Sequence, residues 1–426
     1  MRLVVHFFFF IFVAIYCIHD VQAQRVANAS IKVGEIVLDG KLNEIGWETA
    51  EVTSDLTQFS PNPGNKSSQK TEIRILYDDE AIYVGAQMFD TAPDSILMQY
   101  SQRDQVKNSD EFGIQFSPYN DGINGVAFAT TPAGILVDVN ISPTGQDFNW
   151  DAVWNVQTVV DENGWTAEFK IPWSALRFSK MEQGEEIVWG LNFYRKIRRL
   201  REFPVWEPMD PTSTVEGLRE TGELHGFRQI TPPLRMTLFP YVSVYGENME
   251  DGKLGTRING GMDLKAGIGD AFTLDMTLIP DFGQVVADNL VLNLSAFEIE
   301  FQDNRPFFTE GTELFNKSGL FYSRRIGENL QLINASKFSG RTKGGLGIGA
   351  LQAFAIDAEA SDTTDNTPVT SYSVAVLDQT LPHNGYVHGI STFVTNDGES
   401  ALVQGVDFEL RNKQNSQAVY GQASYS

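Results

Sequence analysis

The segment Phe272-Thr-Leu-Asp-Met-Thr-Leu-Ile-Pro-Asp-Phe-Gly283 alternates between apolar and polar side chains. Apolar residues occupy Phe272 and every second position up to Leu278, and polar residues, Asp275 among them, lie between them. Because alternate side chains of a β-strand point to opposite faces, this strand has one apolar face and one face that carries a charge. A transmembrane barrel strand needs this arrangement, with lipid outside and water inside, but a half-buried strand of a soluble sheet shows it too.

The first 23 residues predict an export signal. Arg2 supplies the basic end, an apolar run follows, and Ala23 is the small residue before cleavage, so we expect the mature chain to begin at Gln24. The alternative is an N-terminal membrane anchor, but the apolar run is short for a spanning helix. The only cysteine, Cys17, lies inside this signal after the bulky Tyr16, which does not fit a lipoprotein cleavage site. We therefore expect a mature protein without disulfides or a cysteine metal site.

The chain is strongly acidic, with 32 Lys and Arg against 55 Asp and Glu and a formal net charge of −23. Nucleic-acid binding is disfavoured, because a phosphate backbone requires a basic surface. Acidic residues in turns usually serve solubility, and clusters of them outside the cell can also hold calcium.

Short alternating segments separated by Gly, Asn, Asp and Pro predict an all-β protein. Residues 28–227 contain regularly spaced strands, including a hairpin across 161–163, which favour two stacked sheets in a β-sandwich. The pair Pro232 and Pro233 marks a joint, because proline cannot sit in the middle of a sheet. From 234 to 426 the segments are roughly as long as tilted membrane strands, so we expect an antiparallel transmembrane β-barrel.

Segments of the first half of the mature chain resemble carbohydrate-binding module family 9-like domains. They are Val37-Leu-Asp-Gly-Lys-Leu-Asn-Glu-Ile-Gly-Trp47, Tyr77-Asp-Asp-Glu-Ala-Ile-Tyr-Val84 and Gly164-Trp-Thr-Ala-Glu-Phe-Lys-Ile-Pro-Trp-Ser-Ala-Leu-Arg-Phe178. The resemblance implies a sandwich that binds a sugar, and it leaves the identity of the sugar open.

Segments of the second half resemble the barrel domain of unknown function 5916, which follows such modules in Bacteroidetes-type outer-membrane proteins. They lie at residues 262–265, 274–284, 293–298, 305–311 and 321–327. The resemblance implies an outer-membrane barrel with several more strands than this chain has. Residues 417–426 also stop in mid-pattern without a terminal aromatic residue. We therefore expect a truncated barrel, visible as an open sheet with its last strand at one edge.

Two tryptophans in a loop are the main candidates for sugar contacts. Trp150 and Trp154 are four residues apart just before a predicted strand, so they could form one platform on which the apolar face of a sugar ring stacks. The alternative is that they fill the end of the sandwich core. Asp110 and Asp151 are the carboxylates that we assign to the same carbohydrate site. Core packing is expected for Trp165 and Trp189, which lie within alternating strands, and Trp47 is expected to plug an end of the sandwich.

Asp121 and Asp138 are weak candidates for a structural calcium site, the only cofactor that we consider. The spacing of an EF-hand is absent, and solvated turn acids are the alternative. In the second half, Arg324, Arg325 and Glu310 are predicted to form an ion-pair network in the barrel lumen, because charge facing lipid is costly. The alternative there is a salt-bridged turn of a soluble protein.

The sequence thus predicts an outer-membrane protein whose sandwich, periplasmic or surface-exposed, binds a polysaccharide or oligosaccharide at the cell envelope, with membrane lipid as the second partner. One alternative is glycoside hydrolase-associated activity on O-glycosyl compounds in carbohydrate catabolism, which requires two carboxylates across a cleft. No catalytic constellation is identifiable, and His383 and His388 form only a lone pair. The other alternative is a structural envelope or secretion component that binds no sugar.

Overall fold

The computed structural model describes residues 24–426, except 121–124, 143–144, 149, 179–186, 210–219, 229, 231–232, 249–253, 270, 281–300, 302, 329, 343, 358–367, 383–384 and 413–416. The predicted export signal, Asp121, His383 and the segment 293–298 therefore lie outside the described residues. Within the described part of the chain, no helix is both long and apolar enough to cross a membrane.

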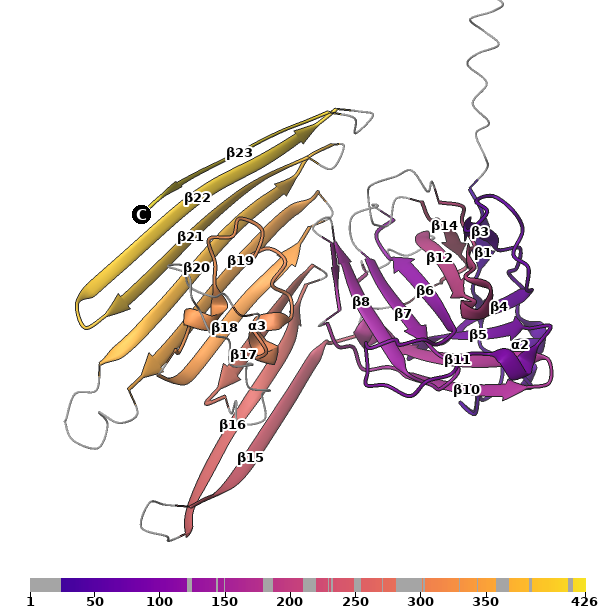
Figure 1. The fold of residues 1–426 in the computed structure, drawn as a ribbon, viewed down its shortest axis with the longest axis horizontal. Helices are drawn as coiled ribbons and strands as arrows, with labels where there is room; N and C mark the ends of the chain where they lie inside the picture. Colours follow the sequence, from indigo (N-terminus) through magenta and orange to yellow (C-terminus); the bar gives the residue numbers. More distant parts are fainter. Residues whose placement is uncertain are drawn as a thin grey trace, which may run out of the picture.

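Two sheets stack to form the predicted sandwich (Figure 1). The larger sheet has the order β1 (Val26–Asn28), β14 (Gly222–His225), β12 (Trp189–Lys196), β6 (Glu111–Ser117), β7 (Gly125–Thr130), β8 (Leu136–Ser142) and β9 (Gly145–Asp147), with β13 (Phe203–Val205) and β3 (Thr57–Ser60) attached beside β12. The smaller sheet has the order β10 (Asn155–Asp161), β11 (Gly164–Pro172), β5 (Ala81–Phe89), β4 (Thr71–Tyr77) and β2 (Ser30–Ile31). Short helical turns connect them: α2 (Ile45–Thr49), η1 (Pro93–Ser95), η2 (Trp173–Ala175) and η3 (Arg198–Leu200).

Side chains from the facing sides of both sheets meet in one aromatic core. Phe112 of β6 lies 6.0 Å from Phe169 of β11 between ring centroids, so the contact crosses from one sheet to the other. Trp165 and Trp189 are buried in this core, as predicted. The predicted hairpin across 161–163 is also present, because β10 pairs with β11 in antiparallel register.

The carboxylate of Glu168 ties the segment 39–47 to the outer face of the smaller sheet. Its Oε1 accepts a hydrogen bond from Trp47 Nε1 at 3.0 Å, and its Oε2 accepts from the backbone N–H groups of Asp39 and Gly40 at 2.9 and 2.7 Å. Gly40 has a φ of +83°, and a Cβ there would lie 2.8 Å from Val159 Cγ2, so this turn requires glycine. Burial raises the pKa of Glu168, and the hydrogen bonds oppose that rise. Trp47 is buried, but in a separate cluster with Leu76 and Tyr83 on the outer face of the smaller sheet, so the expectation that it plugs an end of the sandwich is wrong.

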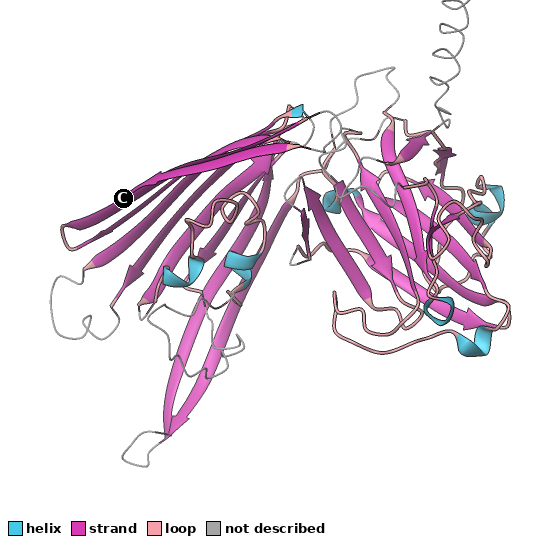
Figure 2. Cartoon of the chain, turned by 45° about the horizontal axis from the view of Figure 1, so that its top comes forward, coloured by secondary structure: helices cyan, strands magenta, loops and turns pink. Residues whose placement is uncertain are grey.

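Nine long strands after the sandwich form a third sheet in which each strand pairs with its sequence neighbour (Figures 1 and 2). They are β15 (Met236–Asn248), β16 (Leu254–Ile268), β17 (Phe272–Leu278), β18 (Gln331–Arg341), β19 (Leu346–Ile356), β20 (Val369–Thr380), β21 (Tyr386–Asn396), β22 (Glu399–Arg411) and β23 (Ala418–Tyr425). Among the described residues, β15 pairs only with β16 and β23 only with β22. The sheet is therefore open, as the truncated-barrel hypothesis expects, and no closed barrel is formed.

One face of this sheet is apolar and exposed. In β17 this face carries Phe272, Leu274, Met276 and Leu278, and register pairs them with β16 residues such as Leu264. The same face continues across the sheet through residues that are each more than a third exposed: Val242, Val244, Ile258, Phe354, Leu377, Phe393 and Val406. The alternation of apolar and polar residues seen in Phe272–Leu278 thus extends over the whole sheet.

The opposite face carries charged residues together with an apolar cluster, and it is covered by residues 303–328, called here the covering segment, which includes α3 (Pro306–Thr309) and η4 (Ser323–Arg325). Leu314 and Phe315 of this segment are fully buried in the same apolar cluster as Leu351. Charged residues of the covered face are paired: Asp378 lies 2.7 Å from Lys317 and 2.6 Å from Arg341.

The covering segment also contains the three residues predicted to line a lumen. The Glu310 carboxylate forms an ion pair with Lys265 of β16, so it does lie on the covered face. Arg324 is half-buried and Arg325 exposed, both in η4. The network that the structure does show at this turn is built instead on Arg305, which pairs with Asp303 and donates to backbone carbonyls of η4 and its neighbour. The lumen itself stays a prediction.

Candidate functional site

A loop between two strands of different sheets carries Trp150. β9 returns antiparallel to β8, and the chain then crosses to β10 in the smaller sheet. Trp150 lies in this crossing, half-buried, with its ring 6.0 Å from that of Phe128 in an edge-to-face contact. Its inner edge is therefore fixed by the core while part of the indole stays accessible.

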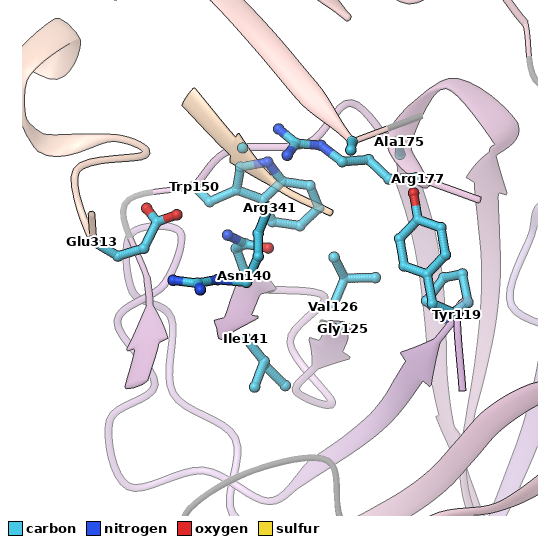
Figure 3. Close-up of a pocket in the computed structure, with 13 residues that line it drawn as sticks. Tyr119, Gly125, Val126, Asn140, Ile141, Trp150, Ala175, Arg177, Glu313 and Arg341 are labelled. Carbon is cyan, nitrogen blue, oxygen red and sulfur yellow. The ribbon is translucent and has the colours of Figure 1, made fainter. Parts of the chain in front are cut away.

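Trp150 lines a pocket between the sandwich and the third sheet (Figure 3). The sandwich contributes Trp150, Tyr119, Asn140 and Arg177, among others, and the sheet with its covering segment contributes Glu313, Arg341, Gly340 and Ala271.

Two hydrogen bonds join the regions beside this pocket. The guanidinium of Arg177 donates to Thr273 Oγ1 of β17, and the backbone N–H of Gly311 donates to Asp147 Oδ2 at 3.2 Å. Asp147 ends β9, three residues before Trp150, so the loop of Trp150 is tied directly to the covering segment.

The electrostatics of the pocket centre on Glu313. Burial raises the pKa of the Glu313 carboxyl, the charge of Asp147 adds to the rise, and Arg177 and Arg341 oppose it. The pocket thus combines an indole, two guanidinium groups, an amide and a buried carboxyl, which is chemistry suited to stacking and hydrogen bonding with a polar ligand.

The structure corrects the expectation of a platform made of two exposed indoles. Trp154 is only 4% exposed, and its ring stacks on Phe169 with centroids 5.7 Å apart and an interplanar angle of 2°. Core packing, the alternative considered from the sequence, therefore describes Trp154. Trp150 alone faces the pocket, and its contact with sugar stays a prediction.

Asp110 is also far from Trp150. It is 1% exposed, and its Oδ1 accepts a hydrogen bond from the backbone N–H of Arg198 at 3.1 Å. It directly precedes β6, whereas Pro118 of the pocket directly follows β6, so a strand of about 20 Å separates them. The structure therefore gives Asp110 a buried structural role and does not bring it to the Trp150 pocket.

Asp151 and Asp138 come together in a cluster next to the pocket. Carboxylate oxygens of Asp104, Asp138 and Asp151 lie within 4.8 Å of one another. The guanidinium of Arg103 already pairs with all three, at 3.7, 2.6 and 2.8 Å respectively. Burial, and the neighbouring charges of Asp138 and Asp151, raise the pKa of Asp104 to about 6.

This cluster does not fit a calcium ion in the described geometry. Calcium takes six to eight oxygen ligands, and Arg103 fills the space among the three carboxylates that would have to supply them. Calcium binding by Asp138 stays a prediction, and Asp121 lies outside the described residues.

His388 is committed to structural hydrogen bonds. It is fully buried, with Nδ1 2.8 Å from Asp407 Oδ1 and Nε2 2.9 Å from the carbonyl oxygen of Leu314. Both ring nitrogens are thus engaged with the sheet and the covering segment, and neither faces the Trp150 pocket.

The sequence analysis missed Asn140, Arg177, Glu313 and Arg341 as pocket residues. Arg177 and Glu313 are separated by more than a hundred residues, and only the docking of the sheet against the sandwich brings them together. The segment 164–178 did contain Arg177, but its motif marks a strand and a turn rather than a ligand contact.

Two family models match the chain. Residues 38–195 match the Carbohydrate family 9 binding domain-like family, and residues 232–331 and 328–426 match the Domain of unknown function (DUF5916). Both matches confirm the two families that the sequence resembles, and the outer-membrane barrel that the second resemblance implied stays a prediction. No curated protein matches the sequence.

Solved structures similar to the chain include a carbohydrate-binding module family 9 from Caldicellulosiruptor kristjanssonii in complex with cellotriose. It is 16% identical, and the match covers 48% of this chain and 95% of that one with a TM-score of 0.33. A Bacteroides uniformis protein provisionally assigned as carbohydrate-binding is 14% identical, with 48% and 100% coverage and a TM-score of 0.38.

Proposed function

We propose that this chain, a carbohydrate family 9 binding domain-like sandwich followed by a DUF5916 region, binds an oligosaccharide or polysaccharide at the outer membrane. The family match of the sandwich supports sugar binding in general. The observation that carries the proposal is Trp150, a half-buried indole at a pocket with Asn140 and Arg177 beside it. Sugar rings stack their C–H faces on an indole while polar neighbours bind the hydroxyl groups.

The outer-membrane part of the proposal is supported by the third sheet. Its strands run up to 15 residues, in β16, and one face of the sheet is apolar and exposed from β15 to β23. Acyl chains would cover such a face, whereas its exposure to water would cost about 25 cal/mol for each Å² of apolar surface. The export signal predicted at residues 1–23 is consistent with this location.

The test uses the full chain on a glycan array together with fractionation of the expressing cells. We expect retention on at least one neutral glycan and recovery with the outer membrane. Absence of binding to every glycan would contradict sugar recognition and favour a structural envelope component. Release of reducing ends from a bound glycan would favour the glycoside hydrolase-associated alternative, and recovery in the soluble periplasmic fraction would contradict the membrane location.

A further inference from the structure

We propose that Glu313 of the covering segment completes the Trp150 pocket as the acceptor for hydroxyl groups of a neutral sugar. The DUF5916 region would then supply a specificity-determining residue to a site that the sandwich only half builds. This inference rests on the proposed sugar binding and names its ligand class.

Glu313 is held firmly at the pocket by its neighbours. Leu314 and Phe315, the next two residues, are fully buried in the apolar cluster on the covered face of the sheet. On the other side, Gly311 donates its backbone N–H to Asp147 of the sandwich loop. Figure 3 shows the Glu313 carboxylate directed toward the Trp150 side of the pocket, with Tyr119 at the far side of the view. The carboxylate is thus positioned by both regions of the chain.

The hydrogen-bonding capacity of Glu313 is incompletely used. Its Oε2 is buried, and no group in the described part of the chain donates a hydrogen bond to it. A buried acceptor without a donor costs free energy, and a ligand that supplies the donor recovers it. Burial raises the pKa of this carboxyl, while a backbone hydrogen bond and the charges of Arg177 and Arg341 oppose the rise.

The cationic groups of the pocket, in contrast, already have partners. Arg341 forms an ion pair with Asp378 at 2.6 Å, and Arg177 donates to Thr273. Arg341 Nη2 makes no hydrogen bond with the described residues despite its ion pair, but its charge is compensated, so the free acceptor of Glu313 favours a ligand that brings a donor such as a sugar hydroxyl. An acidic sugar would place a second carboxylate beside Glu313, where like charges repel, so the geometry favours neutral sugars over uronic acids.

The experiment compares full-length wild-type protein with Glu313→Gln by calorimetric titration. The probes are neutral gluco-, xylo- and manno-oligosaccharides, with oligogalacturonate as the acidic probe. Glu310→Gln is the matched control, because Glu310 lies in the same segment but pairs with Lys265 outside the pocket lining. We expect Glu313→Gln to weaken neutral-sugar binding about tenfold or more. The reason is that the sugar hydroxyl would donate to a neutral amide oxygen instead of a charged carboxylate, and the hydrogen bond to the amide is weaker. The control should change affinity less than about twofold.

The outcomes separate this inference from the proposed function. Unchanged neutral-sugar affinity in Glu313→Gln, with binding lost in Trp150→Ala, would overturn the role of Glu313 and leave sugar binding intact. Tighter binding of oligogalacturonate than of neutral sugars would also overturn it. Failure of the wild-type protein to bind any probe would refute the proposed function itself. If Glu313→Gln loses its cooperative thermal transition, Glu313→Asp is tested in its place. This variant keeps the charge but moves it away from the pocket, so it should also weaken neutral-sugar binding, and unchanged affinity would overturn the role of Glu313.

Discussion

The sandwich and the third sheet use the same alternating sequence pattern with opposite polarity. In the sandwich, alternate apolar residues such as Phe112 and Phe169 face each other across a closed core. In the third sheet, apolar residues such as Val242 and Val406 face outward, and charged residues such as Asp378 lie under the covering segment. The alternation specifies only that a strand has one apolar and one polar face. Whether the apolar face packs against a second sheet or points outward then determines on which side the charged residues are buried.

One acidic cluster of the sandwich differs from Asp378 of the sheet in how its charge is compensated. Asp378 in the sheet has both Lys317 and Arg341 as partners. In the sandwich, Asp104, Asp138 and Asp151 share the single guanidinium of Arg103, so negative charge remains in excess. The charge of Asp378 is therefore compensated, whereas the cluster of Asp104, Asp138 and Asp151 beside the Trp150 pocket is not fully compensated.

Replacing a core indole should give the largest effect on stability. Trp154→Ala removes a buried ring that stacks on Phe169, so we expect the free energy of unfolding of the sandwich to fall by about 3–5 kcal/mol. Phe354→Ala on the outward face of the sheet is the comparison, expected to cost less than about 1 kcal/mol in water. Denaturant melts measure both, and equal losses would contradict the opposite polarity of the two regions.

A charge on the outward face of the sheet should be costly only in lipid. Val406→Arg is expected to destabilise the protein in lipid vesicles by about 2–4 kcal/mol, because an arginine at bilayer depth is poorly solvated. Tyr420→Arg lies on the other face of the neighbouring strand β23 and should be nearly neutral. Urea titration of vesicle-inserted protein checks this. Equal effects of the two variants would show that the outward face does not meet lipid.

The attachment of the segment 39–47 to the outer face of the smaller sheet should depend on one carboxylate. Glu168→Gln replaces an acceptor of three hydrogen bonds by an amide whose N–H group opposes those donors, at a cost of about 1–3 kcal/mol. Glu162→Gln, in an exposed turn, is the control and should leave the thermal midpoint unchanged. A Glu168→Gln protein as stable as the control would show that the turn at Asp39 and Gly40 holds without it.

Removing one charge from the cluster of Asp104, Asp138 and Asp151 should stabilise the folded protein slightly. The pKa of Asp104 is raised to about 6, so the folded protein binds its proton more tightly than the unfolded chain does. Stability should therefore fall as the pH rises from about 4 to about 6. Asp104→Asn should remove that dependence and raise stability at pH 7 by on the order of 1 kcal/mol after solvent screening. Thermal midpoints at pH 4 and 7 check this, and a variant less stable at pH 7 would show that the Arg103 pair outweighs repulsion.

Strand patterns predicted the architecture well because alternation and turn residues are local features. The segment from Phe272 to Leu278 is the strand expected, and the sandwich hairpins have the expected pairing. The expected Trp150 and Trp154 platform failed because β10 begins only at Asn155, so the rule that residues four apart share a face does not apply in the preceding loop. Glu313 could not be found from the sequence, since its place depends on how two distant regions dock.

Affinity for a neutral oligosaccharide, measured for wild-type protein, Trp150→Ala and Phe148→Ala, tests the account most directly. Phe148 is an exposed aromatic residue of the same loop that does not line the pocket, so it controls for loop disturbance. The account predicts that Trp150→Ala weakens binding about tenfold or more, or at least about 1.4 kcal/mol, while Phe148→Ala binds as the wild type does. Wild-type affinity in Trp150→Ala, with its cooperative melt intact, would contradict the account.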